Sequence, residues 1–173
     1  ACMNLARGFS LLGRKVTILS MNTVKHQVKL EEIPEAIKDL AEFKLIKVPA
    51  RISKISALIN LLFSKKPYNA VRFISGPFKT GLKNLLQENK FDIIQLEGLY
   101  VCPYIPLIRQ YSSAKIVYRA HNIEHEIWER TSEMASGLVR IYLKILSNRI
   151  KKFEKGLLNN YDLLVPITER DRA

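Results

Sequence analysis

The fold of this chain is constrained most by two short apolar runs, residues 91–96 (FDIIQL) and residues 115–118 (KIVY). Isoleucine, valine, leucine and tyrosine fill both runs without strict alternation, which is typical of strands buried on both faces of a parallel sheet. Each run ends abruptly in polar residues and is followed by a pattern with helical spacing. These features predict an α/β fold in which helices flank a parallel sheet.

The remaining chain supplies further predicted strands and helices. Strand-like runs occupy residues 15–20, 44–48 and 161–167, and helical patterns occupy residues 1–12, 33–43, 52–63, 67–76, 77–89 and 137–158. A helix cap is predicted to begin at residues 168–171. With 173 residues and 47% hydrophobic content, the chain is expected to form a single Rossmann-like domain over residues 1–173.

The order of elements at the start of the chain carries a further expectation. In a doubly wound domain, a central strand and a tight glycine-rich turn precede the first helix. This sequence opens directly on a predicted helix, and Gly13 is suited to end it. We therefore expect the sequence to lack the first strand of its domain.

Positive charge is concentrated in one segment. The formal net charge is +12, and residues 44–90 hold ten lysines and arginines against one acid, Glu88. Such a segment attracts nucleic acid, anionic lipid or phosphorylated substrates. Within it, residues 52–63 have the pattern of a basic amphipathic helix, which either attaches to an anionic membrane surface or docks on the sheet with its lysines solvated. Because most amphipathic helices bury their apolar face, the pattern favours the docked helix.

Cysteine usage and hydropathy argue against several classes of protein. Cys2 and Cys102 lie 100 residues apart and form no CxxC pair, so neither a disulfide scaffold nor a cysteine-rich zinc site is indicated. This usage is typical of a reducing, cytoplasmic setting. No apolar run reaches the roughly 18 residues that span a bilayer, and we expect no secretory leader.

Polar residues follow both central runs, at the points where parallel sheets bind ligands. In open α/β sheets the binding crevice lies beyond the carboxyl ends of the strands. Glu97 and Gly98 follow the first run, and Arg119, His121 and Asn122 follow the second. A carboxylate at the end of a buried strand is costly unless it is paired or faces a ligand. Glu97 is therefore expected to orient an acceptor hydroxyl, to act as a base, or to pair with Arg119.

Residues 121–125 (HNIEH) match the HxxEH pattern of inverted zinc peptidases, in which both histidines bind Zn²⁺ and the glutamate is the base. That chemistry needs both histidines on one helical face. However, His121 directly follows a β-rich run, and Asn122 is better suited to cap a helix than to lie inside one. The sequence favours His121 as a lone imidazole facing the crevice, where it can bind a sugar hydroxyl or neutralise charge near a phosphate. A purely structural histidine is the alternative.

Residues 91–130, together with YDLLVPITERD at residues 161–171, resemble the amino-terminal domain of family 4 glycosyltransferases with the GT-B fold. The resemblance covers most of the chain. The opening helix and the GRKVTILS of residues 13–20 are similar to the first helix and second strand of that family, and residues 161–169 to its domain-closing strand. The His-Asn pair at 121 and 122 is the most diagnostic feature.

The resemblance implies a retaining hexosyltransferase, which moves a sugar from a nucleotide-sugar donor to a glycan, lipid or other cell-envelope acceptor. His121 matches the family histidine that contacts the transferred sugar. The expected acceptor-side residues are Glu97, Gly98, Tyr100, Arg119 and Asn122. In that family a carboxyl-terminal domain carries the Glu-x7-Glu element and most nucleotide contacts, so residues 1–173 alone are expected to be inactive.

The resemblance also implies which partners to expect. No metal and no organic cofactor is expected beyond the nucleotide-sugar co-substrate, and no nucleic acid. Residues 44–90 occupy the region where many relatives meet membrane lipids or large anionic acceptors, so we expect a cytoplasmic protein for which the anionic inner face of the membrane is one candidate partner. The alternative from a different class is a non-catalytic α/β module that binds anionic lipid or nucleic acid through its basic surface.

Overall fold

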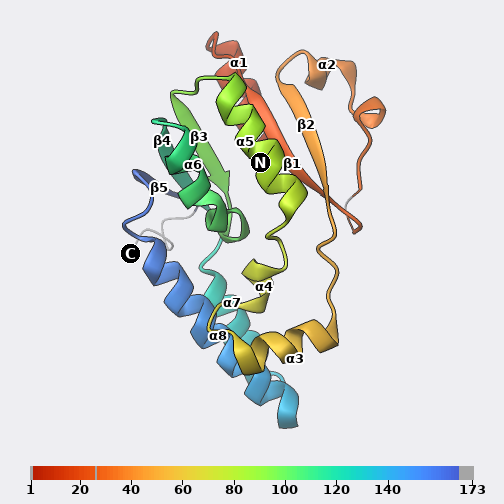
Figure 1. Cartoon of the computed structure of the whole chain (residues 1–173), viewed down its shortest axis with the longest axis vertical. Helices are drawn as coiled ribbons and strands as arrows, with labels where there is room; N and C mark the ends of the chain where they lie inside the picture. Colours follow the sequence, from red (N-terminus) through yellow and green to blue (C-terminus); the bar gives the residue numbers. More distant parts are fainter. Residues whose placement is uncertain (1, 26, 168–173) are drawn as a thin grey trace.

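The computed structural model describes residues 2–25 and 27–167, and it has an α/β, Rossmann-like fold (Figure 1). Within the described residues, the strands are β1 (Thr17–Thr23), β2 (Glu42–Val48), β3 (Ile93–Glu97), β4 (Lys115–Ala120) and β5 (Leu163–Pro166). The helices are α1 (Cys2–Leu11), α2 (Glu35–Lys38), α3 (Lys54–Phe63), α4 (Tyr68–Val71), α5 (Gly76–Glu88), α6 (Ile105–Tyr111), α7 (Glu124–Glu133) and α8 (Gly137–Leu157), with short 3-10 helices η1 (Leu30–Glu32) and η2 (Leu99–Tyr104). The predicted α/β class is confirmed.

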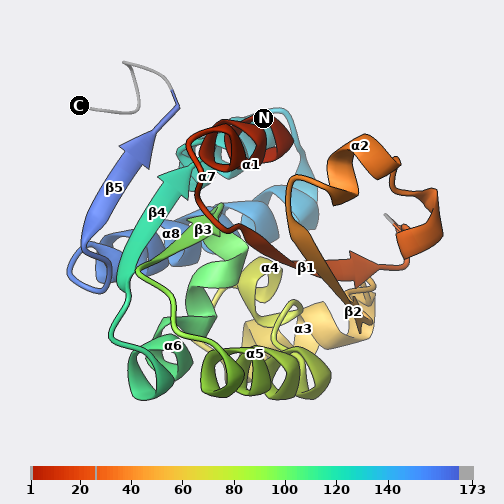
Figure 2. The ribbon, with the colours of Figure 1, turned by 90° about the horizontal axis from the view of Figure 1, so that it is seen from above.

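The strands form two small parallel sheets rather than one. β1 pairs with β2, and β4 lies between β3 and β5. Figure 2 shows these strands in one layer, with α1 on one face and α5 and α6 on the other. The sheet is divided because β1 and β3, which end the two sheets at neighbouring edges, have no ladder of backbone hydrogen bonds between them. All pairings are parallel, as the apolar runs predicted.

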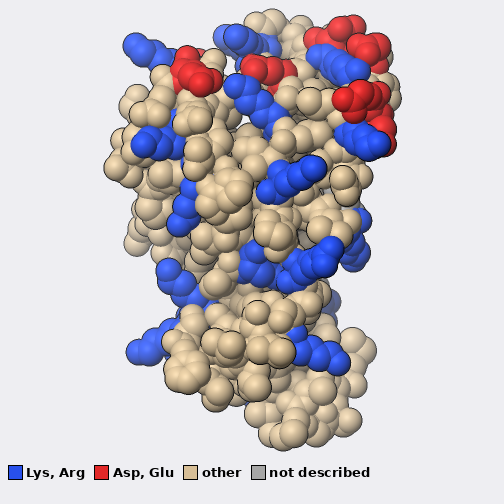
Figure 3. Space-filling model, turned by 45° about the vertical axis from the view of Figure 1, so that its right-hand side comes forward, with Lys and Arg blue, Asp and Glu red and all other residues tan. Residues whose placement is uncertain are grey.

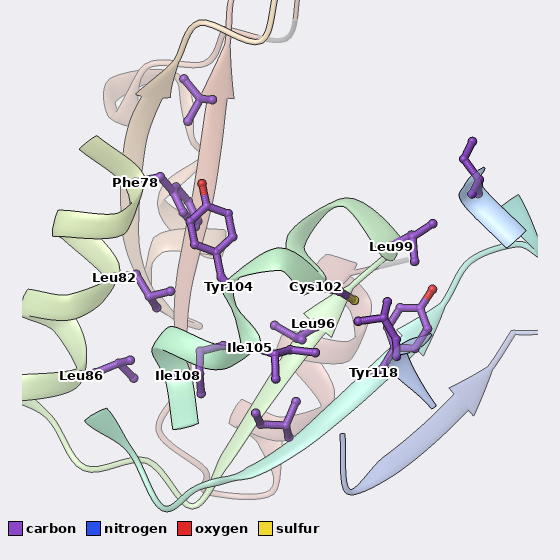
Figure 4. Packing of buried hydrophobic residues seen from close by; sticks show 14 of the residues in the cluster. Phe78, Leu82, Leu86, Leu96, Leu99, Cys102, Tyr104, Ile105, Ile108 and Tyr118 are labelled. Carbon is purple, nitrogen blue, oxygen red and sulfur yellow. The ribbon is translucent and has the colours of Figure 1, made fainter. Parts of the chain in front are cut away.

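One hydrophobic core joins the three-stranded sheet to its covering helices. Ile116 of β4 and Ile150 of α8 are both fully buried, at 0% exposure. Leu82 and Leu86 of α5, which lie on one face of that helix, pack into the same cluster. Figure 4 shows these leucines beside Ile105 and Ile108 of α6, with Leu96 of β3 on the other side of the isoleucines. The strand ends that carry the candidate site therefore leave a well-packed core.

Two predicted helices are wrong in extent. Within residues 33–43 the structure has only the single turn of α2, because Glu42 already pairs with Thr17 and begins β2. Within residues 67–76 only α4 is helical, and the chain then turns so that Ser75 caps α5. The remaining predicted strands and helices are present with shifts of about one to three residues at their ends. The predicted cap at residues 168–171 lies outside the described residues.

The prediction that the amphipathic helix of residues 52–63 docks on the sheet is wrong. α3 forms, but none of its residues is buried. Its large apolar side chains, including Ile55 at 72% and Phe63 at 83% exposure, face away from the core. The periodicity predicted the helix correctly, but it could not show which way the apolar face points.

Candidate functional site

The carboxyl ends of β3 and β4 meet at one edge of their sheet. In the parallel register Glu97 lies opposite Arg119, and the Gly98 amide donates to the Arg119 carbonyl over 3.1 Å. Gly98 has φ +87°, a conformation that side chains other than that of glycine rarely adopt. The chain thereby turns sharply out of β3 into η2. The strand register therefore brings Glu97, Arg119 and the residues after them together.

The Glu97 carboxylate is the centre of this cluster. Its Oε2 accepts a hydrogen bond from Arg119 Nη1 over 3.0 Å and lies 2.6 Å from His121 Nε2. Its Oε1 accepts from the side-chain amide of Gln95. The Glu97 side chain is 22% exposed, whereas that of His121 is 39% exposed. Glu97 is thus engaged inside the protein and fixes the imidazole, which is the member of the cluster that remains most accessible.

The surroundings of Glu97 favour its charged form. Burial alone would raise the pKa of Glu97, but hydrogen bonds from His121, Gln95 and Arg119 outweigh burial and hold the pKa below its usual value of 4.5. Because the pKa is lower in the folded state, ionised Glu97 stabilises the fold at a pH above 4.5. This contribution is lost as the pH falls through the lowered pKa.

Glu97→Gln is expected to reduce the free energy of unfolding by about 1–2 kcal/mol at pH 7, because it removes a charge-assisted pair. The difference between the wild type and the variant should shrink as the pH falls below 4.5. Urea unfolding at pH 7, 5 and 3.5 measures this difference, in which the contributions of other carboxyl groups cancel. A difference that grew on acidification would contradict the assigned ion pair.

Tyr100 and Glu124 form a second polar contact beside this cluster. The Tyr100 hydroxyl donates to Glu124 Oε2 over 2.7 Å, which joins η2 to the first turn of α7. Burial, aided by the nearby Glu154 charge, raises the pKa of Glu124 even though the Tyr100 hydrogen bond lowers it. Burial also raises the pKa of the Tyr100 hydroxyl. The first turn of α7 therefore presents a half-buried carboxyl group whose proton is held more firmly than usual.

His121 and His125 belong to different structural units. His121 follows β4 and lies outside α7, whereas His125 is within α7 and its Nδ1 contacts Glu154 Oε2 on α8. Glu154 also accepts from the backbone amides of Glu124 and His125, over 2.8 and 3.1 Å. It thereby caps the amino terminus of α7 from a neighbouring helix. Consequently the HxxEH interpretation is wrong in its geometry, since the two histidines do not share a helical face.

The described residues 2–25 and 27–167 contain no group of three or more His, Cys, Asp and Glu side chains placed to hold a metal ion. The predicted placement of His121 at the end of a β-strand is confirmed.

The structure brings most of the predicted site residues together but leaves Asn122 outside the group. Glu97, Arg119 and His121 form one hydrogen-bonded group, and Gly98 and Tyr100 adjoin it. Asn122 is exposed, and the predicted cap role is wrong because Ile123 occupies the N-cap position of α7. Gln95 was missed, although its position two residues before Glu97 on the same strand face could have indicated it. The capping role of Glu154 was also missed, and no local signal connects it to residues so far away in sequence.

A hollow in the described part of the chain lies elsewhere. A cavity of about 420 Å³ is bounded by α1, the two-stranded sheet and the α2 segment, with mainly apolar lining that includes Met3, Ile18, Ile37 and Phe43. His121 does not line it.

The chain matches no known protein-family model, and searches of curated proteins and of solved structures gave no match either. The case for a function therefore depends on the strand-end cluster and on the sequence resemblance.

Proposed function

We propose that this chain is the acceptor-side domain of a retaining hexosyltransferase of the family 4 glycosyltransferase type, acting on a glycan, lipid or other cell-envelope acceptor. The observation that carries the proposal is the imidazole of His121 held by Glu97 at the carboxyl ends of β3 and β4. Ligands of open α/β sheets bind at this edge. The resemblance of residues 91–130 to that family supports the same role for His121.

In this proposal each member of the cluster has a distinct task. His121 forms a hydrogen bond to a hydroxyl of the sugar, using the ring nitrogen that is not directed at Glu97. Glu97 is a positioning residue, because its two oxygens already accept from Arg119, His121 and Gln95. Arg119 balances the charge of Glu97, and it is only 16% exposed in its side chain. Gly98 and Tyr100 shape the wall of the crevice.

The proposal assigns the nucleotide part of the donor to a second domain, as in the family that the chain resembles. It needs no metal and no organic cofactor, since the nucleotide-sugar is a co-substrate. It also places the domain in the cytoplasm, where such donors are made.

Sugar binding by the domain itself tests the proposal. Among the three histidines of the chain, the ring signals of His121 should shift on titration with millimolar methyl glycosides of glucose, galactose and mannose. His125 should not respond, because its ring is tied to Glu154. Histidine-labelled NMR measures both, with His121→Gln used for assignment. If no glycoside moves His121 while an oligonucleotide binds and moves basic residues instead, the nucleic-acid module is the better description.

A further inference from the structure

α3 displays an apolar face to solvent along its whole length. The exposed side chains are Ile55, Leu58, Ile59, Leu62 and Phe63, at 54–83% exposure, and Ile52 just before the helix is 76% exposed. The side of α3 that faces the protein carries Ala57, Asn60 and Leu61, which are partly buried. Most of the large apolar side chains of α3 are therefore directed outward.

Polar contacts at both ends hold α3 in this orientation. At its start, the Ser53 amide donates to the Tyr68 hydroxyl over 3.0 Å, and Tyr68 itself is buried. At its end, Arg149 of α8 donates to the carbonyls of Asn60 and Leu61, over 3.1 and 2.8 Å. These bonds satisfy carbonyls that a helix end leaves free. The apolar face is thus presented by a fixed helix.

The start of α8 carries a second group of exposed apolar side chains. Leu138, Val139 and Ile141 are 84%, 60% and 58% exposed, and Met134 just before α8 is 84% exposed. Figure 1 shows this end of α8 and α3 at the same end of the molecule, opposite α1 and α2, and Figure 2 shows them separated from each other. Large exposed apolar side chains gathered at one end of a monomeric protein indicate a surface that meets a partner or a membrane. We call residues 51–66 and 134–145 the α3–α8 surface.

The charges on this surface are of one sign. It carries six exposed basic residues and no acid, although Glu133 directly precedes its second segment; the basic residues are Arg51, Lys54, Lys65, Lys66, Arg140 and Lys144. Figure 3 shows acidic side chains gathered at the opposite end, near α2, and only basic ones among uncharged residues at the α3 end. Apolar side chains fringed by lysine and arginine match the acyl and headgroup layers of an anionic bilayer.

We propose that the α3–α8 surface docks on an anionic lipid bilayer, with the apolar side chains of α3 and of the start of α8 inserted among the headgroups. This attachment is interfacial, and within the described residues no helix combines the length and hydropathy needed to cross a membrane. The proposal does not depend on sugar transfer, because it rests on the exposed residues alone. It extends the basic segment of residues 44–90 by a second contact from α8.

Vesicle co-sedimentation tests the docking. Binding to phosphatidylcholine vesicles with 30% phosphatidylglycerol should exceed binding to pure phosphatidylcholine by about tenfold or more, and should weaken between 0.1 and 0.5 M salt. The double variant Leu62→Ser, Phe63→Ser should lower the partition coefficient at least about tenfold, because it removes two inserted apolar side chains. A matched control, Leu11→Ser with Leu12→Ser, changes two leucines of similar exposure, 75% and 74%, at the far end of the molecule. The control should bind as the wild type does.

Three outcomes would overturn the proposal. The first is equal binding to neutral and anionic vesicles, or none to either. The second is an equal loss of binding in both double variants. The third is a concentration-dependent dimer in sedimentation velocity that disappears in Leu62→Ser, Phe63→Ser, since this would assign the surface to a second copy of the chain. Circular dichroism confirms that both variants are folded, as expected for exposed positions.

Discussion

Replacing His121 by alanine is expected to lower kcat/KM for the proposed sugar transfer by about 30- to 150-fold, in a protein that joins this domain to the proposed nucleotide-sugar-binding domain. The imidazole is held by Glu97 over 2.6 Å and directed to the edge of the sheet where ligands bind. A hydrogen bond made to the sugar in the transition state by so constrained a donor contributes about 2–3 kcal/mol, which corresponds to a factor of roughly 30–150 in rate. Steady-state kinetics with the natural acceptor measures the change.

His125→Gln is the control for this experiment. His125 is tied to Glu154 inside the α7–α8 pair and makes no contact with Glu97, so its substitution should lower stability and leave kcat/KM within about threefold at temperatures where the variant is folded. Glu97→Gln should alter the pH dependence of the rate, because it releases the ring from its carboxylate. Wild-type turnover in His121→Ala would remove His121 from the proposed chemistry.

Ile150→Ala is expected to reduce the free energy of unfolding by about 3–4 kcal/mol, the largest stability effect that we predict. Ile150 is fully buried on α8 and packs in the cluster that contains Ile116 of β4. Truncation removes three carbons and leaves a void that the surrounding helices and strands fill only in part. Because the free energy of unfolding of small domains is only about 5–15 kcal/mol, this single change removes a large fraction of it.

The matched control is Ile141→Ala on the same helix, where the side chain is 58% exposed and the loss should stay below about 1 kcal/mol. Urea unfolding followed by the fluorescence of Trp128, the single tryptophan, gives both values. Equal losses at the two positions would mean that α8 does not pack on the sheet through Ile150.

The parts of the fold that sequence predicts well are those whose residues bury a face. The runs at residues 91–96 and 115–118 became β3 and β4, because buried strands need continuous apolar side chains. The meeting of Glu97 with Arg119 followed from the parallel arrangement of those strands. In contrast, α3 has the same amphipathic pattern as a docked helix, yet its apolar face points outward, and contacts with the distant residues Tyr68 and Arg149 accompany this orientation.

The candidate site shows the same division between local and distant information. The turn of the chain after β4 placed His121 correctly, because a strand end is a local feature. The N-cap of α7 was assigned to Asn122 on residue preference, yet Glu154 supplies the acceptors from 30 residues away in sequence. A side chain from another helix can replace a local cap, and nothing in the residues around position 122 reveals it.

α8 is a continuous helix with exposed apolar side chains at one end, and near the other end its Glu154 contacts the first turn of α7. Leu138 and Glu154 are 16 residues apart on it, which corresponds to about 24 Å along the axis. If the end of α8 at Leu138 rests on lipid, this length limits the distance between the His121 imidazole and the lipid headgroups. In the proposed transferase, a lipid-anchored acceptor would then react only if its hydroxyl extends no farther than this distance from the membrane surface. The length of α8 would therefore limit which acceptors can be used.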